Sequence, residues 1–369
     1  MINMKYFTVP AAYSFESVLQ LHKLNQEFTE AKVQETYGQI TIENHIGSGR
    51  AHDLIPQVDI NQLQEYISFS DKWGIRFNYT LNTTCMGNLE FTKDGLNEIK
   101  LFLQALYDAG VRSLTIAMPS LIEYVHSLPF KFEIKASTVC QITNVNKAMS
   151  YKQIGADKIV LDESINRNFS ALESITNAFG DNIEIIVNVI CHKNCIYEMF
   201  HHNQTSHDIN CEINKKSVTY YSHRCMMKRC ESPETILKLA WIRPEDINYY
   251  VNVGLSYFKI QGRQASVYGD VYKTVKAYMQ GWYDGDLMRL LDCFMPTNSF
   301  QSQIDNRKLD NFLKPFVNGK HICKDDCTSC HYCETYMNKH FDVNSIKEKN
   351  ETANMFYQNY DEFIRAYKN

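Results

Sequence analysis

The feature that most constrains the fold of this chain is an alternation of short β-rich segments with amphipathic helical segments over about its first 265 residues. Eight segments are typical of strands, because β-branched and aromatic residues concentrate in them and turn residues bound them. Glycines precede several of them, as expected where a helix ends and leads into a parallel strand. The expected strands are Phe7–Val9, Val33–Tyr37, Arg76–Leu81, Ser113–Ala117, Phe132–Lys135, Lys158–Leu161, Glu184–Val189 and Tyr257–Ile260.

Eight strands that alternate with helices predict an α/β fold of the (β/α)8 type, a TIM barrel, with an open doubly wound sheet as the alternative. The interval between the seventh and eighth strands, roughly residues 190–256, is unusually long. Loops that follow barrel strands gather on the C-terminal face, where barrel enzymes keep their active sites. We therefore expect a catalytic barrel over residues 1–295 with a long functional insertion, and a cysteine-rich extension over residues 296–369.

Eight of the twelve cysteines fall into two compact sets, which indicates a metalloprotein. Four thiolates can complete one tetrahedral metal site or one iron–sulfur cluster. A disulfide framework is not expected, because disulfide-rich domains are small and secreted, whereas this chain has 369 residues and 44% hydrophobic content. The first set is Cys191, Cys195, Cys225 and Cys230, and the second is Cys323, Cys327, Cys330 and Cys333.

The first set has the better location for catalysis. Cys191 and Cys195 directly follow the seventh expected strand, and Cys225 and Cys230 arrive about thirty residues later, after a His-rich segment. Cys85 follows the third strand on the same face and competes as a ligand, in which case Cys225 or Cys230 is spare. A buried apolar thiol is the alternative for any single member. The remaining thiols are expected to be plain buried residues: Cys140, Cys211 and Cys293.

The second set has the spacing C-x3-C-x2-C-x2-C within eleven positions. This spacing is closer to cluster-binding runs of ferredoxins than to a zinc ribbon, whose two cysteine pairs are normally far apart. An iron–sulfur cluster is therefore expected there, with zinc or unmetallated thiols as alternatives. His321 and His331 are nearby substitute ligands.

The ends and the charge of the chain bear on its compartment and partners. The N-terminal residues lack the basic and apolar regions of a signal peptide, and no run approaches the roughly 20 apolar residues of a membrane span. We expect a cytoplasmic protein in a reducing compartment, without a membrane partner. The net charge of −4 gives no general attraction to nucleic acid, so RNA is not the favoured partner.

Several stretches, in their order and spacing, resemble the collagenase-like peptidase family U32 over about residues 5–290. The resemblance implies a (β/α)8 barrel whose mouth cysteines hold a [4Fe-4S] cluster. Members of that family with assigned roles include oxygen-independent hydroxylation systems for ubiquinone precursors and for bases of tRNA or ribosomal RNA. The cysteine spacing here departs from that of the best-known hydroxylases, which leaves the substrate open. The stretches are Asn82–Asn88, Asn188–Cys195, Phe200–Asn203 with Ser206–His207, Trp241–Asp246 and Phe258–Arg263.

Charged and histidine side chains near the strand ends are the remaining candidates for catalysis. Arginines and lysines there suit binding of carboxylate or phosphate, and the histidines suit proton donation or ordering of the loop. Structural ion pairs with Asp162 or Glu163 are the alternative for the cations. The candidates are Arg50, Arg243, Lys259 and Arg263 for an anionic substrate, and His201 and His207 for proton transfer.

These observations predict an iron–sulfur barrel enzyme that carries out an oxygen-independent, hydroxylation-type redox modification of a small anionic molecule, a peptide or an RNA base. An electron donor or a partner subunit is expected. A peptidase and a non-catalytic iron–sulfur subunit are the alternatives. The peptidase gains little support from motifs, because the sequence has neither a Gly-x-Ser-x-Gly elbow nor a His-Glu-x-x-His zinc motif.

Overall fold

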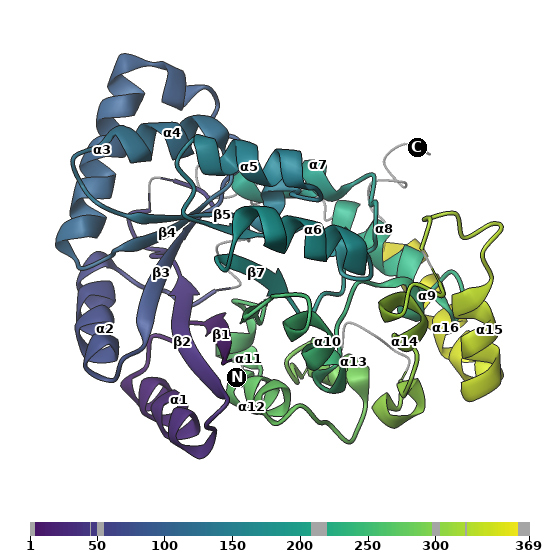
Figure 1. Cartoon of the computed structure of the whole chain (residues 1–369). Helices are drawn as coiled ribbons and strands as arrows, with labels where there is room; N and C mark the ends of the chain where they lie inside the picture. The colour runs from purple at the N-terminus through teal and green to yellow at the C-terminus, as the bar shows by residue number, and fades with distance from the viewer. Residues whose placement is uncertain are drawn as a thin grey trace.

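Eight parallel strands close into a barrel in chain order, which confirms the predicted (β/α)8 architecture (Figure 1). The structure is a computed structural model and describes residues 4–44, 46–49, 55–207, 220–296, 303–321 and 323–360. The barrel closes where β1 pairs with β8, and Phe7 lies opposite Phe258. The strands are β1 (Lys5–Pro10), β2 (Ala31–Gly38), β3 (Arg76–Leu81), β4 (Ser113–Ile116), β5 (Glu133–Ala136), β6 (Lys158–Val160), β7 (Ile183–Ile186) and β8 (Tyr257–Lys259).

Every expected strand is present, and the differences lie at the ends. The seventh differs most: β7 ends at Ile186, whereas the sequence predicts a strand to Val189. The chain beyond β7 is still buried, because Val187 and Val189 are 0% and 1% exposed. An apolar run therefore continues past the last ladder pair, and hydrophobicity alone does not show where pairing stops.

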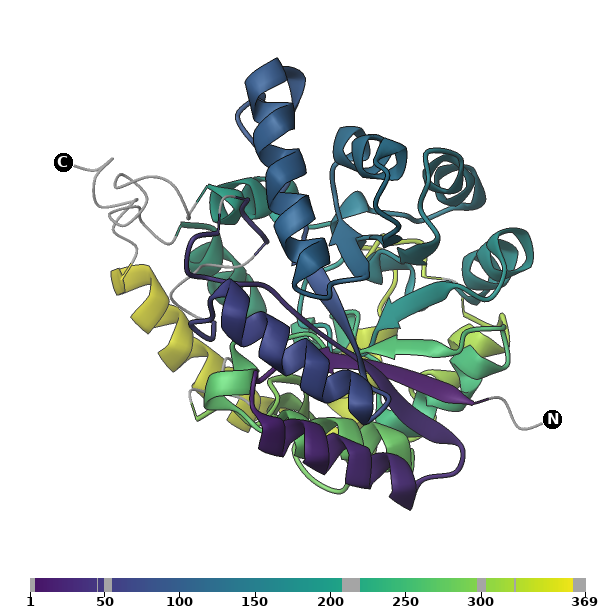
Figure 2. The same cartoon turned by 90° about the vertical axis from the view of Figure 1, so that its left-hand side faces the viewer.

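Helices surround the strands on the outside (Figure 2). Their starts follow ordinary capping chemistry. Ser14 caps the first helix, and Asp59 with Gln62 forms a full capping box on the second. The helices between successive strands are α1 (Phe15–Glu27), α2 (Ile60–Lys72), α3 (Lys93–Asp108), α4 (Pro119–Ser127), α5 (Val145–Gln153) and α6 (Phe169–Phe179).

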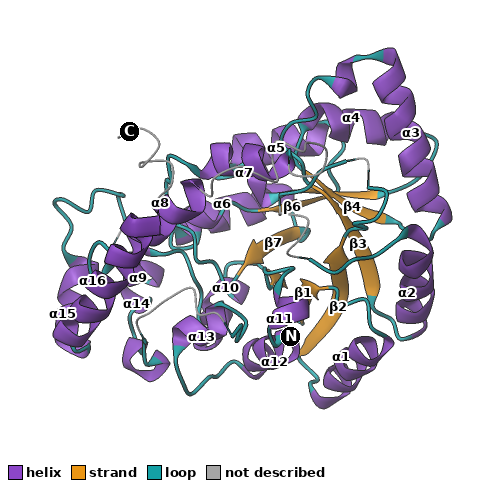
Figure 3. Cartoon of the chain, turned by 180° about the vertical axis from the view of Figure 1, so that it is seen from behind, coloured by secondary structure: helices purple, strands orange, loops and turns teal. Residues whose placement is uncertain are grey.

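The long interval between β7 and β8 folds into short helices, and the C-terminal extension packs against them. Contacts join α16 to α8 and α15 to α9, and these helices gather at one side of the barrel (Figure 3). Within the described residues, no helix combines the length and apolar character needed to cross a membrane. The insertion holds α7 (Glu198–Ser206), α8 (Tyr220–Arg229), α9 (Thr235–Lys238) and α10 (Ile247–Val251). After β8 come α11 (Ala265–Tyr268), α12 (Val271–Gln280), α13 (Leu287–Leu291), α14 (Lys314–Val317), α15 (Tyr332–His340) and α16 (Val343–Tyr360).

Candidate active site at the barrel mouth

A polar cavity of about 90 Å³ lies at the C-terminal ends of the barrel strands. Hydroxyl and amide side chains dominate its lining, and two cations, Lys259 and Arg263, face it. No carboxylate occurs among the described residues that line it. The cavity therefore suits a polar or anionic group. Its lining is Tyr37, Gly49, Thr80, Asn82, Thr115, Ser137, Thr138, Val139, Val160, Ile186, His202, Lys259, Gln261, Gly262 and Arg263.

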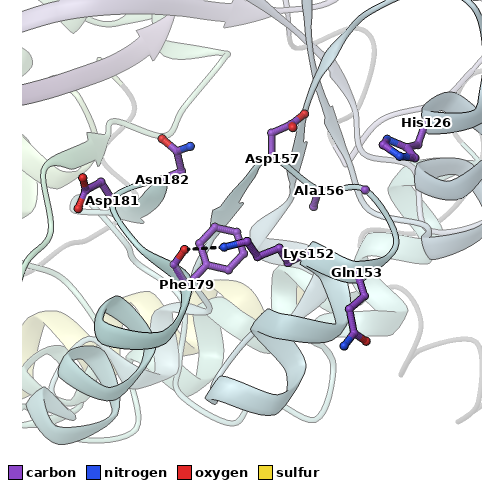
Figure 4. Close-up of a pocket in the computed structure, with 9 residues that line it drawn as sticks. His126, Lys152, Gln153, Ala156, Asp157, Phe179, Asp181 and Asn182 are labelled. Atoms are coloured by element: carbon purple, nitrogen blue, oxygen red, sulfur yellow. Dashed lines mark hydrogen bonds between the residues drawn. The ribbon is translucent and has the colours of Figure 1, made fainter.

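A larger cavity of about 480 Å³ lies at the opposite end of the barrel, before β6 and β7 (Figure 4). The polar groups around it serve the fold: Nζ of Lys152 donates to the carbonyl of Phe179 at 3.1 Å, and Asp157 accepts from the backbone N–H of Ile134 at 2.9 Å. Residues at the N-terminal face of such barrels usually contribute to stability. We therefore place the candidate active site at the mouth.

Lys259 is the last residue of β8 and is buried. Its ammonium lies 4.1 Å from the centre of the Tyr37 ring. It makes no hydrogen bond or ion pair with any residue that the structure describes, so the predicted alternative of a pair with Asp162 or Glu163 is absent. Burial lowers the pKa of Lys259 to about 8, and the nearby Lys135 and Arg263 cations act in the same direction against the attraction of Glu184.

Beneath Lys259, a buried ionic triad crosses the barrel lumen. Nζ of Lys135 lies 2.6 Å from Oε1 of Glu35 and 2.7 Å from Oε2 of Glu184. Burial by itself would raise the pKa of Glu184, but the Lys135 cation outweighs this effect and lowers that pKa to about 2. Sequence reasoning missed this triad, although charged residues inside three expected strands were a usable signal.

Of the predicted arginines, Arg263 lies at the cavity. One of its N–H groups donates to Oε1 of Gln39 in a close hydrogen bond, and it also donates to the hydroxyl of Ser48 at 2.9 Å. Arg263 therefore anchors the loop that follows β2. Arg50 lies outside the described residues.

Arg243 lies away from the cavity lining, where it serves the fold. Its Nε donates to Asp246 at 2.9 Å, and Nη1 donates to Asp310 at 3.1 Å and to the carbonyl of Asn306 at 2.8 Å. The structural ion pair that the sequence allowed is thus present, but with Asp246 and Asp310 as partners. Because the side chain is 2% exposed and joined to the extension, we do not assign Arg243 to substrate binding.

Helix α7 brings a histidine to the cavity, and it is His202 that lines it. The rings of His201 and His202 are parallel at a centroid distance of 6.2 Å, and His207 is the C-cap of the helix. Two hydrogen bonds hold α7 against the loop after β3: Thr84 Oγ1 donates to Asn203 at 2.6 Å, and the Thr84 N–H donates to Ser206 at 2.9 Å. Helical phase decides which histidine points inward, so the sequence pattern did not separate His202 from its neighbour.

Three cysteines of the first set share one region at the mouth. The thiols of Cys191 and Cys195 both interact electrostatically with Cys225. Burial raises the pKa of the Cys191 thiol well above its usual value, and Glu163 adds to this shift. Cys230 lies at the end of α8, where Tyr357 of α16 interacts with it. The sequence left Cys225 and Cys230 as equivalent candidates, whereas the structure places Cys225 near both Cys191 and Cys195.

These thiols do not form a ready-made metal site. Among the described residues, no three His, Cys, Asp or Glu side chains are placed to hold a metal ion. Cys85 accepts from the Gly87 N–H at 3.5 Å. The donor chemistry of three clustered thiols fits a soft metal or an iron–sulfur cluster, but the ligands would have to converge on binding.

Carboxyl groups connect this cysteine region to the cavity. Thr138, which lines the cavity, donates to Oε2 of Glu163 at 2.9 Å, and Glu163 in turn hydrogen-bonds Cys191. Glu198, at the start of α7, is close enough to Glu163 for repulsion, and burial with this repulsion raises the pKa of Glu198 to about 8. A chain of polar contacts thus leads from the cavity wall to Cys191.

The second cysteine set lies against the first. Nζ of Lys193 lies 3.5 Å from the Cys323 sulfur, and Cys333 interacts electrostatically with Cys327 and Cys323. Nε2 of His321 lies 3.6 Å from the Cys330 sulfur. This histidine is therefore close to the second cysteine set, as the prediction of a substitute ligand requires. Cys140 and Cys293 are buried, as predicted, whereas Cys211 lies outside the described residues.

Comparisons with known proteins agree with this fold. The model of a family described as peptidase family U32 matches residues 50–286. An uncharacterized protease of Methanocaldococcus jannaschii is 28% identical over 90% of this chain and 98% of its own length. Among solved structures, the U32 peptidase Mk0906 superposes with a TM-score of 0.51 at 16% identity, over 71% of this chain and 94% of that one.

Two further relatives have names that state a reaction. The 23S rRNA 5-hydroxycytidine C2501 synthase of Escherichia coli is 24% identical over a region that covers 66% of this chain and 36% of that protein. The tRNA hydroxylation protein P1 of Bacillus subtilis is 30% identical over 31% of this chain and 25% of its own length. Both similarities cover only a minor part of the relative.

Proposed function

Because this chain belongs to peptidase family U32, we propose that it is an enzyme that hydroxylates a substrate group held in the cavity at the mouth of its barrel. One observation supports this function above others: a cationic, carboxylate-free cavity lies beside clustered thiols, and Thr138 and Glu163 connect the two. The two relatives named for hydroxylation favour the same reaction class. The substrate would be an RNA base or a small anionic molecule.

A [4Fe-4S] cluster would be held by Cys191, Cys195 and Cys225, with Cys85 or Cys230 as the fourth ligand. Such a cluster, when bound, supplies one-electron redox chemistry beside the cavity. Replacement of a C–H bond by C–OH with oxygen from water releases two protons and two electrons. Because this step is an oxidation, the electrons would pass to an external acceptor, such as a redox partner protein, in place of the electron donor expected from the sequence. The second cysteine set would hold a further iron–sulfur cluster or zinc.

The residues of the chain itself would bind and orient the substrate. Lys259 and Arg263 provide positive charge for an anionic group, and burial strengthens this attraction because the local dielectric is low. Asn82 and Gln261 offer amide groups, and Thr80 offers a hydroxyl that has no partner among the described residues. His202 could move a proton at the cavity rim.

The decisive experiment measures iron, acid-labile sulfide and zinc per chain after anaerobic purification, with an EPR spectrum of the reduced protein. About four irons and four sulfides at the mouth are expected, and Cys191→Ala with Cys195→Ala should remove them. Cys140→Ala is the matched control, because this thiol is buried outside both sets. Unchanged iron in the double variant would overturn the proposal.

A peptidase is the second candidate, favoured by the name of the Methanocaldococcus relative. It predicts cleavage of a denatured collagen or casein substrate. Cleavage that survives both metal removal and the Cys191→Ala, Cys195→Ala pair would establish this candidate in place of the hydroxylase.

A further inference from the structure

We propose that Lys259 is a nucleophile that forms an imine with the carbonyl carbon of a small aldehyde or ketone bound in the mouth cavity. The inference uses the same cavity as the proposed hydroxylation but requires no metal centre. The two proposals can therefore fail separately.

The position of Lys259 carries the first part of the argument. The side chain is 7% exposed, faces the cavity, and has no hydrogen-bond or ion-pair partner among the described residues. A buried ammonium without a partner is costly, so buried lysines are normally paired. Lys135, which lies deeper in the barrel lumen, is paired in this way, because its ammonium forms ion pairs with two carboxylates. Lys259 lies close to the same acids and is still not joined to either.

The surroundings of Lys259 carry the second part. Lys135 from β5 and Arg263 after β8 repel a positive charge on Lys259, while Glu184 from β7 and Glu35 from β2 attract it. Burial together with the two cations prevails and brings its pKa to about 8. Roughly a tenth of the amines would then be neutral at pH 7, compared with fewer than one in a thousand for an ordinary lysine. Desolvation and a neighbouring cation are the two means by which nucleophilic lysines are activated.

The cavity also offers what imine formation needs. The neutral Nζ attacks the carbonyl carbon, the carbon–oxygen π bond breaks, and the oxygen takes up a proton while the nitrogen loses one. The hydroxyl of this carbinolamine takes up a second proton and leaves as water, and the nitrogen lone pair forms the C=N bond of a protonated imine without any net oxidation. The hydroxyl of Thr80 is buried, lines the cavity and has no partner among the described residues, so it can donate to the carbonyl oxygen. A protonated imine would keep its charge near Glu184 and Glu35.

Reductive trapping tests the proposal. The full chain is incubated with pyruvate as the carbonyl probe and treated with sodium borohydride, which converts an imine into a stable secondary amine. Intact mass and peptide mapping should show one adduct per chain, at Lys259. Adduct formation should fall at least tenfold in Lys259→Arg, which keeps the charge but forms no imine. The adduct should also form in metal-free protein and in the Cys191→Ala, Cys195→Ala variant.

Lys158→Arg is the matched control. Lys158 is also buried and has a lowered pKa, but it lies at the start of β6 over the Tyr257 ring at 3.9 Å, outside the cavity lining. This variant should trap pyruvate as the wild type does. Labelling spread over surface lysines, or saturable binding of pyruvate without an adduct at Lys259, would overturn the proposal. Both outcomes are read on the wild-type chain, so they do not depend on how the variants fold.

Discussion

Nζ of Lys193 lies 2.5 Å from Oδ1 of Asp325. Lys193 stands between Cys191 and Cys195, and Asp325 stands between Cys323 and Cys327, so this ion pair joins the loops of the two cysteine sets. Asn194 adds a hydrogen bond to the same carboxylate. The cysteine-rich extension is thereby held to the barrel mouth.

Replacement of Lys193 by alanine should loosen the extension with little loss of global stability. The pair is partly exposed, so we expect the free energy of unfolding to fall by less than about 1 kcal/mol. Amide hydrogen exchange in residues 323–331 should become several-fold faster. Lys238→Ala, which breaks a comparable pair with Glu234, is the control. Equal exchange rates in both variants would contradict the linkage.

Replacement of Lys135 by methionine should be far more costly. The change leaves Glu35 and Glu184 buried without their cation, and breaking a buried pair in this way costs about 3–5 kcal/mol. Denaturant unfolding monitored by circular dichroism measures this loss. A loss below about 1 kcal/mol would mean that these carboxyls take up protons or water at little cost.

The same triad predicts that the free energy of unfolding decreases at acidic pH. The pKa of Glu184 falls from its usual value near 4.5 in the unfolded chain to about 2 in the folded protein. The unfolded state therefore binds more protons over this interval, so the stabilising contribution of Glu184 is complete above about pH 4.5 and is lost as pH falls toward 2. Unfolding free energies at several pH values should decline less steeply in Glu184→Gln. Parallel curves for the two proteins would refute this assignment.

The placement of the cysteines predicts that Cys225 is a more important ligand of the proposed cluster than Cys230. If the proposed cluster binds, Cys225→Ala should lower the iron content of the protein, because Cys225 interacts with both Cys191 and Cys195. Cys230→Ala should retain more of it, because Cys230 lies near Tyr357 of α16. Iron content and visible absorbance of the two variants give the comparison, and the reverse order would show that Cys230 is the essential ligand.

Gly155, which lines the cavity of about 480 Å³ at the N-terminal end of the barrel, should tolerate an added side chain poorly. Its φ is +107°, and an added Cβ would lie 2.5 Å from Cγ of His126. Gly180 has a similar φ of +96° but open space around it, so Gly180→Ala isolates the backbone strain, about 1–3 kcal/mol. Gly155→Ala should cost about 1–3 kcal/mol more because of the overlap. Equal thermal unfolding temperatures would show that His126 moves aside freely.

The sequence was sufficient for the barrel, and it predicted the C-terminal face as the place of the candidate site. Strand and helix patterns repeat over short stretches, so the eight strands were identifiable from local composition. Lys259 does end β8, whereas Cys191 lies five residues beyond the end of β7. The same local information gave the correct burial of Cys140 and Cys293.

The partners of those residues came only from the tertiary structure. Lys135 and Glu35 are 100 positions apart and meet because strand register and barrel closure bring β2, β5 and β7 around one lumen. The choice of His202 over its neighbour, the pairing of Arg243 with Asp310, and the docking of Asp325 on Lys193 depend in the same way on packing between distant elements. Side-chain type determines what a residue can bind, but the fold decides which groups are within reach, and for Lys259 the described part of the chain supplies no pairing partner.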